Sequence, residues 1–189
     1  PVRAAVVART LAGLVEGLGP GLARALRELT SVSTATVTLG FERRELPELP
    51  KGFGFVIPKS AGRTINAATF VSQKFQRSAD GPYLIRCFLG GAGKEGALER
   101  ADQELQERAL ADLRDIAGLQ AAPKLARIYR WSKANPQYNV GHAARMKKIE
   151  EELSRLPGLS LAGASYYGVG IPDCIRSANV TAERAAAQK

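Results

Sequence analysis

Between residues 35 and 90 the chain repeatedly alternates apolar and polar side chains, and this pattern constrains its fold more than any other feature. The alternation is clearest at 35–41, where every second residue is apolar. Three more strand-like stretches follow, separated by the turn-rich segments KSAGR and RSADGP, at 53–58, 64–72 and 83–90. Residues two apart in a strand share one face of a sheet, and short turns join antiparallel neighbours. The sequence therefore predicts an antiparallel meander.

Helical spacing governs the regions on either side of this meander. Apolar residues recur every three or four positions at 98–117, and Gly118 is placed to close that helix. The same spacing predicts a helix at 4–18, with Val7, Leu11, Leu14 and Leu18 on one stripe. A short helix is expected after the break at 19–21 and runs to about residue 29, and another runs from about 142 until Pro157-Gly158 ends it. A further strand is expected at 125–131.

The C-terminal part combines a short apolar segment, a glycine-rich turn and a last helix. LSLAGA, at 159–164, is predicted to be a buried strand, and the helix is expected to begin near Ile171 with Pro172 in its first turn. A strand that runs through a glycine turn into a helix is how α/β proteins present a helix N-terminus to a ligand.

Two glycine motifs in the chain resemble phosphate loops, and both fail the test for one. GGAGKE, at 90–95, has Glu95 where a P-loop needs a hydroxyl that binds magnesium. GVGIPD, at 168–173, has Asp173 where the dinucleotide fingerprint needs its third glycine. Gly168 and Gly170 still allow a close approach to the backbone, beside a helix N-terminus that favours negative charge. Spacing alone does not decide between a ligand there and close packing of a strand on a helix.

Composition excludes several classes of protein. The 189 residues are 45% hydrophobic and carry a formal net charge of +9, but the Lys and Arg residues are scattered and no aromatic side chains are interleaved with them. Nucleic-acid binding is therefore not expected. No signal peptide is expected, and the widely separated Cys87 and Cys174 suggest reduced thiols in a cytoplasmic protein. With a single histidine and no cluster of ligating residues, no metal site and no catalytic constellation is predicted.

Several segments together resemble one family. RWSKANPQYNVGH (130–142), LAGASYYGVGIPDCI (161–175) and GFGFVIPKS (52–60) are similar to the C-terminal half of the FAD-dependent porphyrinogen oxidases of haem synthesis. TINAATFVSQKF and YLIRCFLGGAGKE resemble the bacterial, Gram-positive type of that family. The resemblance runs from about residue 29 to 178, and the PQY…GH and GxGIPDC segments are its most specific parts.

The resemblance implies the C-terminal portion of a two-domain FAD-binding flavoprotein of the amine-oxidase type, with an α+β or α/β fold. Residues 1–29 would be a helical lead-in, 30–130 a substrate-binding domain with a mixed sheet and a helix, and 131–189 the end of the FAD domain. The implied activity is oxidation of a porphyrinogen, coproporphyrinogen III or protoporphyrinogen IX, to the porphyrin, with molecular oxygen reduced to hydrogen peroxide. The Gram-positive character favours coproporphyrinogen III.

The family's functional positions carry over to two groups of residues. The resemblance implies that the flavin is contacted by Trp131, Gly163, Gly168, Val169, Gly170, Ile171 and Pro172. It implies that the porphyrinogen pocket is lined by Phe53, Gly54 and Val56, and also by Ile65, Phe70 and Phe88. No catalytic acid or base is implied. Arg86, on the strand of Phe88, could meet a propionate, although a structural salt bridge is the more ordinary role.

The chain departs from the family pattern at its start. It lacks the glycine-rich fingerprint for the ADP half of FAD and begins without Met, so we expect a fragment that is inactive alone. The resemblance leaves open a peripheral contact with the inner membrane face through the missing half, and a homodimer. Two alternatives also stay open: another flavin oxidase of the amine or carotenoid type, and a basic, non-catalytic binding domain.

Overall fold

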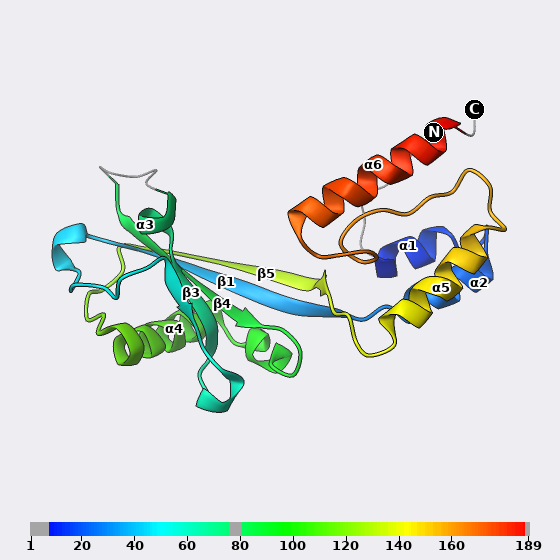
Figure 1. Ribbon diagram of the computed structural model, residues 1–189. Helices are drawn as coiled ribbons and strands as arrows, with labels where there is room; N and C mark the ends of the chain where they lie inside the picture. Colours follow the sequence, from blue (N-terminus) through cyan, green and yellow to red (C-terminus); the bar gives the residue numbers. More distant parts are fainter. Residues whose placement is uncertain (1–7, 76–80, 188–189) are drawn as a thin grey trace. The chain divides into compact units, whose positions relative to one another are not determined.

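The computed structural model describes residues 8–75 and 81–187, and the chain divides into two units (Figure 1). The sheet unit comprises Ser33–Lys133. The helical unit comprises the residues up to Val32 together with those from Ala134 onward. Each unit has its own hydrophobic core.

The sheet has five strands: β1 (Ser31–Phe41), β2 (Gly54–Val56), β3 (Ile65–Phe70), β4 (Tyr83–Gly90) and β5 (Leu125–Pro136). Their order is β2-β3-β4-β1-β5, and β2–β3, β3–β4 and β4–β1 are antiparallel. Strand β5 also runs against β1, because the N–H of Lys124 donates to the carbonyl of Gly40 while that of Gln137 donates to Thr30. The predicted α+β class is confirmed, and the sheet is antiparallel rather than mixed.

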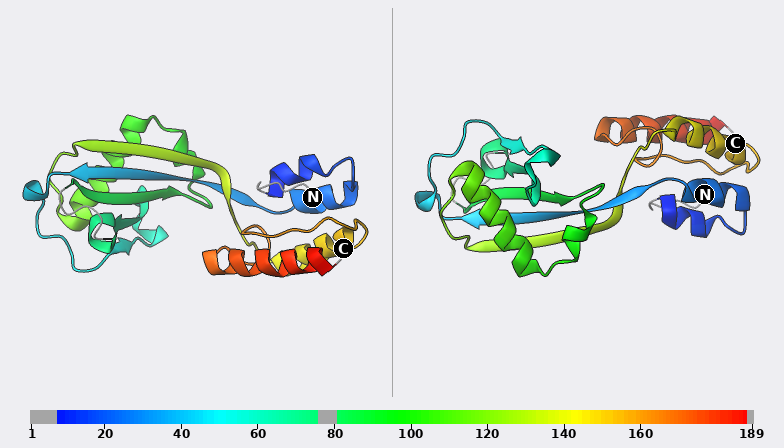
Figure 2. Two further views of the ribbon diagram at one scale, coloured as in Figure 1. Left: turned by 90° about the horizontal axis from the view of Figure 1, so that it is seen from above. Right: turned by 90° about the horizontal axis from the view of Figure 1, so that it is seen from below.

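One face of this sheet is covered by helix α4 (Asp102–Ala117), which lies across the strands when the molecule is seen from below (Figure 2). The apolar residues whose alternation predicted β1 are fully buried on this face: Ala35, Val37, Leu39 and Phe41. Ile85, Cys87 and Leu89 of β4 are buried beside them. Leu105, Ala109 and Leu113 of α4 pack against them. Gly118 ends α4 in the left-handed conformation, as expected. The opposite face of the sheet, which we call the open face, carries the intervening residues.

A buried carboxylate connects α4 to the start of β3. Asp112 is 6% exposed, and its Oδ2 accepts the backbone N–H groups of Thr64 at 2.8 Å and Ile65 at 2.9 Å. Its Oδ1 lies 3.5 Å from the guanidinium of Arg63. A buried backbone N–H needs an acceptor. Asp112 supplies one for two N–H groups that have no partner in the hydrogen-bond ladder of the sheet.

Several element boundaries differ from the sequence prediction. The stretch 64–72 leaves the strand at Phe70, because Val71 begins helix α3 (Val71–Phe75), where Ser72 Oγ accepts the N–H of Leu84. Strand β5 continues to Pro136 instead of ending at 131, since the N–H of Lys133 finds an acceptor in Ser33 Oγ. The described part of the unit also contains the short 3-10 turns η1 (Arg43–Glu45), η2 (Lys59–Ala61) and η3 (Glu95–Glu99).

The helical unit contains α1 (Ala8–Leu14), α2 (Pro20–Arg27), α5 (His142–Leu153) and α6 (Ile171–Ala187). Its core is formed mainly by α1, α2 and α5, and it includes Leu22, Leu26, Met146 and Ile149. The stripe predicted for the first helix is only partly right: Leu11 packs against the core, but Leu14 and Leu18 do not. Leu14 and Leu18 are 60% and 71% exposed, because the helix instead turns Ala8, Ala12 and Val15 inward. Val7 lies outside the described residues.

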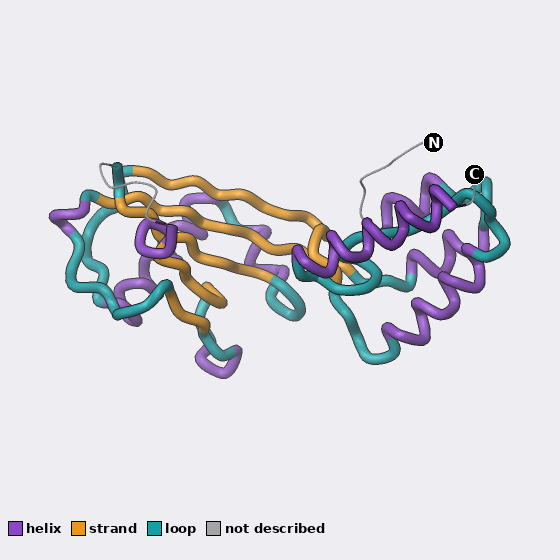
Figure 3. The backbone as a smooth tube through the Cα atoms, turned by 45° about the horizontal axis from the view of Figure 1, so that its top comes forward, coloured by secondary structure: helices purple, strands orange, loops and turns teal. Residues whose placement is uncertain are grey.

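The strand predicted at 159–164 is absent from the described chain, and this segment is loop (Figure 3). Two of its backbone polar groups are paired with side chains of α6. Thr181 Oγ1 donates to the carbonyl of Leu161, and the N–H of Gly163 donates to Ser177 Oγ. Leu161 is buried in the core of the unit, which explains the apolar character that suggested a strand. The predicted start of the last helix at Ile171 is confirmed.

Among the described residues, no helix is both long and apolar enough to cross a bilayer. Within those same residues no group of three or more His, Cys, Asp or Glu side chains gathers as metal ligands would. Both cysteines are free thiols, with Cys87 buried in the sheet unit and Cys174 half-buried on α6.

Candidate functional site

The glycine-rich segment from Gly163 to Gly170 leads directly into α6 and is held by two side chains from the PQYNVGH segment. Tyr138 donates its hydroxyl proton to the carbonyl of Ala164 at 2.7 Å and accepts the N–H of Gly168 at 2.8 Å. His142, the first residue of α5, lies 2.9 Å through Nε2 from the carbonyl of Tyr166. A carbonyl only accepts, so Nε2 carries the proton in this contact.

The rings of Tyr138 and His142 stack on one another, with centroids 3.8 Å apart and planes 11° apart. Burial raises the pKa of Tyr138, although the bond from the Gly168 N–H opposes this shift. The phenol therefore keeps the proton that it donates to Ala164. The stacked pair fixes three backbone positions of the glycine-rich segment, and so determines where the backbone enters α6.

The two glycines before α6 both lie close to the side chain of Asp173. Gly168 has φ +139°, and a Cβ there would lie 2.6 Å from Cβ of Asp173. A Cβ on Gly170 would lie 3.0 Å from Oδ2 of the same aspartate. Asp173 also pairs with Arg176 one turn along the helix. Clearance for Asp173 is thus a sufficient reason for Gly168, whereas at Gly170 a Cβ would require only a small shift of the Asp173 carboxylate.

The start of α6 also presents apolar side chains and backbone donors to its surroundings. Val169 and Ile171 are 61% and 77% exposed. The first helical hydrogen bond runs from the N–H of Cys174 to the carbonyl of Gly170. The N–H groups of Ile171 and Asp173 precede that bond and have no acceptor in the described part of the chain, while Pro172 has no N–H. This arrangement suits a flat, largely apolar group with electron-rich oxygens at one edge.

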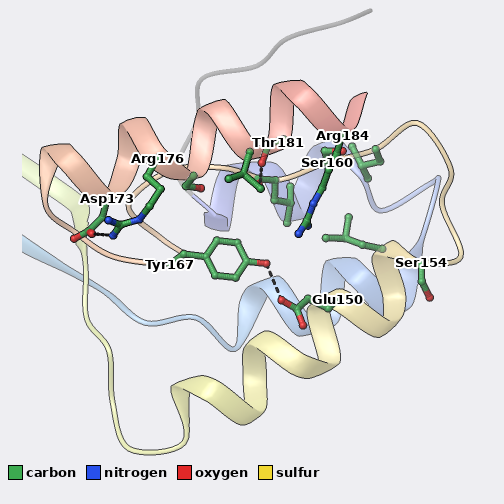
Figure 4. Close-up of a pocket in the computed structure, with 13 residues that line it drawn as sticks. Glu150, Ser154, Ser160, Tyr167, Asp173, Arg176, Thr181 and Arg184 are labelled. Carbon is green, nitrogen blue, oxygen red and sulfur yellow. Dashed lines mark hydrogen bonds and ion pairs between the residues drawn. The ribbon is translucent and has the colours of Figure 1, made fainter. Parts of the chain in front are cut away.

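A cavity of about 700 Å³ lies beside this segment, between α5, α6 and the loop at 159–161 (Figure 4). Tyr167 donates its hydroxyl to Oε1 of Glu150 at 2.9 Å across one wall. Burial, with the nearby negative charge of Glu150, raises the pKa of Tyr167 to about 12, although Arg184 opposes this shift. The lining mixes charged, hydroxyl and aliphatic side chains, so the cavity has no single chemical character.

In the sheet unit, the open face gathers exposed aromatic side chains. Phe88 lies on β4 opposite Ala67 and Thr36, and it is 38% exposed. Tyr129 and Trp131 of β5 are 60% and 49% exposed, with ring centroids 6.4 Å apart. Their neighbours Ala126 and Ile128 pack into the core on the other side, so strand alternation places the two rings on the open face.

Two residues of the predicted substrate wall also lie at the surface of this unit. Phe53 is 60% and Val56 83% exposed, and the register pairs Val56 with Ala67, in the row of Phe88. Gly54 has a different reason to be glycine. Its φ is +143°, and a Cβ there would lie 2.1 Å from the carbonyl oxygen of Ala68, so the close approach is to the neighbouring strand.

Ile65 and Phe70 do not lie where the resemblance implied. They are 0% and 1% exposed, and both side chains belong to the core beneath the sheet, on the side of α4. A bulge between Ile65 and Ala67 interrupts the alternation along β3, so Ile65 faces inward on one side of the bulge and Ala68 and Phe70 on the other. They support the wall from behind and present no side-chain surface on the open face.

Sequence reasoning missed several residues of these surfaces. Tyr138 lay inside the quoted PQYNVGH segment but was given no role, and only the contact with Gly168, 30 positions away, reveals one. Tyr129 could have been found, because it alternates with Trp131 along a predicted strand. Trp131 lies in the sheet unit, whereas the segment from Gly163 to Pro172 lies in the helical unit.

Comparison with known proteins identifies the family. Residues 2–186 match the family described as flavin containing amine oxidoreductase. The chain belongs to this flavin-containing family of amine oxidoreductases. A coproporphyrinogen III oxidase of Bacillus subtilis is 37% identical over 152 residues, which is 79% of this chain and 32% of the relative. The human protoporphyrinogen oxidase is 34% identical over 185 residues, or 93% of this chain and 38% of the relative.

Two solved structures share the fold of this chain. The crystal structure of a provisionally named protoporphyrinogen oxidase from Exiguobacterium sp. 255-15 has a TM-score of 0.79 and 37% identity, over 94% of this chain and 40% of that one. A reduced UDP-galactopyranose mutase shares the fold alone, with a TM-score of 0.55 at 14% identity. The chain spans about a third of the length of the curated relatives that it matches.

Proposed function

We propose that this chain is the C-terminal part of an FAD-dependent porphyrinogen oxidase, which converts coproporphyrinogen III or protoporphyrinogen IX to the porphyrin. The observation that carries this proposal is the contact between the two segments that most resemble the family. Tyr138 and His142 of PQYNVGH bind the backbone of the segment GASYYGVG at Ala164, Tyr166 and Gly168. The two motifs thus form one structure, which ends at the start of α6.

The residues at the start of α6 fit a flavin ring. Val169 and Ile171 offer exposed apolar side chains, and the N–H groups of Ile171 and Asp173 could donate to oxygens at the ring edge. A bound flavin would supply the two-electron acceptor for each oxidation step. The positive end of the helix dipole favours negative charge beside it, so α6 would stabilise the reduced form. In this proposal the helical unit belongs to the FAD domain.

The open face of the sheet fits the substrate. A porphyrinogen is a large, mostly apolar macrocycle, and Phe88, Trp131 and Val56 give it aromatic and aliphatic surface. Conversion to the porphyrin removes six electrons and six protons, which three molecules of oxygen accept as three of hydrogen peroxide. We assign no side chain of this chain as a general acid or base. The residues proposed here bind and orient the ring.

The test uses the full-length protein that carries this chain. The purified protein is expected to show the visible absorption spectrum of bound flavin. It should also produce porphyrin fluorescence from coproporphyrinogen III or protoporphyrinogen IX in air. Simple amines serve as the competing substrates, because the family as a whole is one of amine oxidoreductases. A flavin-containing protein that oxidises amines but neither porphyrinogen would refute the proposed substrate class.

The cellular location follows from the same proposal. A porphyrinogen oxidase with free thiols at Cys87 and Cys174 fits a reducing cytoplasm. The peripheral membrane contact and the homodimer stay predictions.

A further inference from the structure

Two arginines on the open face of the sheet, Arg86 and Arg127, have no acidic partner among the residues that the structure describes. Arg86 donates from Nε to Thr38 Oγ1 at 3.3 Å, and Arg127 donates from Nη1 to the carbonyl of its neighbour Ala126 at 3.0 Å. Within the described residues, neither guanidinium forms an ion pair. On the other side of the sheet, by contrast, Arg130 pairs with Asp102 of α4.

The strand register brings these two arginines level with one another. Gly40 of β1 is opposite Leu84 of β4, and a Cβ on Gly40 would lie 3.2 Å from Cβ of Leu125 on β5. Two residues further along each strand, Thr38 is opposite Arg86, and Arg127 follows Leu125 on the same face. Across the open face, Arg86 of β4, Thr38 of β1 and Arg127 of β5 therefore lie side by side, with β1 between the two arginines.

The next row along the strands supplies the aromatic surface. Phe88 is opposite Thr36 on β1, and Tyr129 follows Arg127 by two residues on β5. Strands β4 and β5 flank β1, so their backbones lie about 10 Å apart at the usual strand spacing. Two positive groups at that separation, beside a row of rings, match an apolar macrocycle whose edge carries more than one carboxylate.

We propose that Arg86 and Arg127 form a carboxylate-binding site for the acidic side chains of the substrate, and that they favour substrates with more carboxylates. The assignment rests on the proposed function. Arginine suits this role because its planar guanidinium binds a carboxylate through two parallel hydrogen bonds, and because it stays charged. Coproporphyrinogen III carries four propionates and protoporphyrinogen IX carries two, so the site should discriminate between them.

The test measures binding of coproporphyrin III and of its tetramethyl ester to the full-length protein, by absorbance titration. Arg86→Gln and Arg127→Gln should each raise the Kd for the acid roughly tenfold, because a hydrogen-bonded charge pair is lost. Binding of the uncharged ester should not change. In the double variant, the ratio of kcat/KM for coproporphyrinogen III over protoporphyrinogen IX should fall.

Arg114→Gln is the matched control, since Arg114 is exposed on α4, on the other side of the sheet, and its loss removes the same charge. It should leave both affinities unchanged. The site is refuted if the substitutions weaken the ester as much as the acid, or if Arg114→Gln has the same effect. If the unsubstituted protein binds neither coproporphyrin III nor its ester, the proposed function is refuted as well. If it binds both and the arginine substitutions leave both Kd values unchanged, only the carboxylate-binding site is refuted.

Discussion

Removing the hydroxyl group of Tyr138 should make the segment that leads into α6 less stable. Phenylalanine at position 138 would keep the ring that stacks on His142 at 3.8 Å, so apolar burial would hardly change. The hydroxyl, however, makes two hydrogen bonds, to Ala164 at 2.7 Å and from Gly168 at 2.8 Å. Both are part-buried, and leaving a buried donor unsatisfied costs about 1–3 kcal/mol. Because water reaches part of this site, we expect Tyr138→Phe to lower the free energy of unfolding by about 1–2 kcal/mol.

The same substitution should weaken flavin binding. If residues 164–168 move once these two hydrogen bonds are lost, the Kd for FAD should rise by up to roughly tenfold, since 1.4 kcal/mol is a factor of ten. Urea unfolding and flavin titration of the full-length protein measure the two effects. Tyr129→Phe is the control, because Tyr129 is exposed on the sheet unit and should change neither quantity. Equal unfolding midpoints and equal flavin affinities for Tyr138→Phe and the unsubstituted protein would refute the reasoning.

Three further outcomes are expected. Asp112→Ala should lower the free energy of unfolding in urea by about 2–4 kcal/mol, because two backbone N–H groups lose their acceptor. Asp112→Asn can keep both bonds through its amide oxygen and should lower it clearly less. A thiol reagent should label half-buried Cys174 well before Cys87, whose pKa burial raises to about 12; equal rates would contradict the burial of Cys87. Burial raises the pKa of Tyr166 and Tyr167 from 10 to about 12, so the folded state holds these protons more tightly and stability should fall as pH rises from 10 to 12. Replacing both with Phe should reduce that alkaline loss, and an unchanged pH profile would contradict it.

The parts of the fold that follow a strict period were predictable from the sequence. Strand β4 has the predicted bounds, and β1 buries each of its four alternating apolar residues. Along α4, Leu105, Ala109 and Leu113 are buried as their spacing indicated, while Ile116 at the end of the helix is 37% exposed. In these elements one face meets a single core, so the pattern of side chains determines which face is buried.

Prediction failed where long-range contacts decide the structure. The segment 159–164 looked like a strand because Leu161 is apolar, yet its backbone bonds to side chains of α6. The first helix buries small residues and exposes Leu14, since close packing of α1 on α2 favours alanine at the contact. Likewise, the role of Tyr138 depends on a backbone amide 30 residues away, and no local pattern contains that information.

The proposed activity is tested most directly by mixing the full-length protein with coproporphyrinogen III in the absence of oxygen. The visible absorption band of oxidised flavin should bleach, with at most one porphyrin formed for every three flavins reduced, and the band should return when air is admitted. Arg114→Gln should behave like the unsubstituted protein in this experiment. A flavin band that persists with both coproporphyrinogen III and protoporphyrinogen IX would contradict the assignment of this chain to a porphyrinogen oxidase.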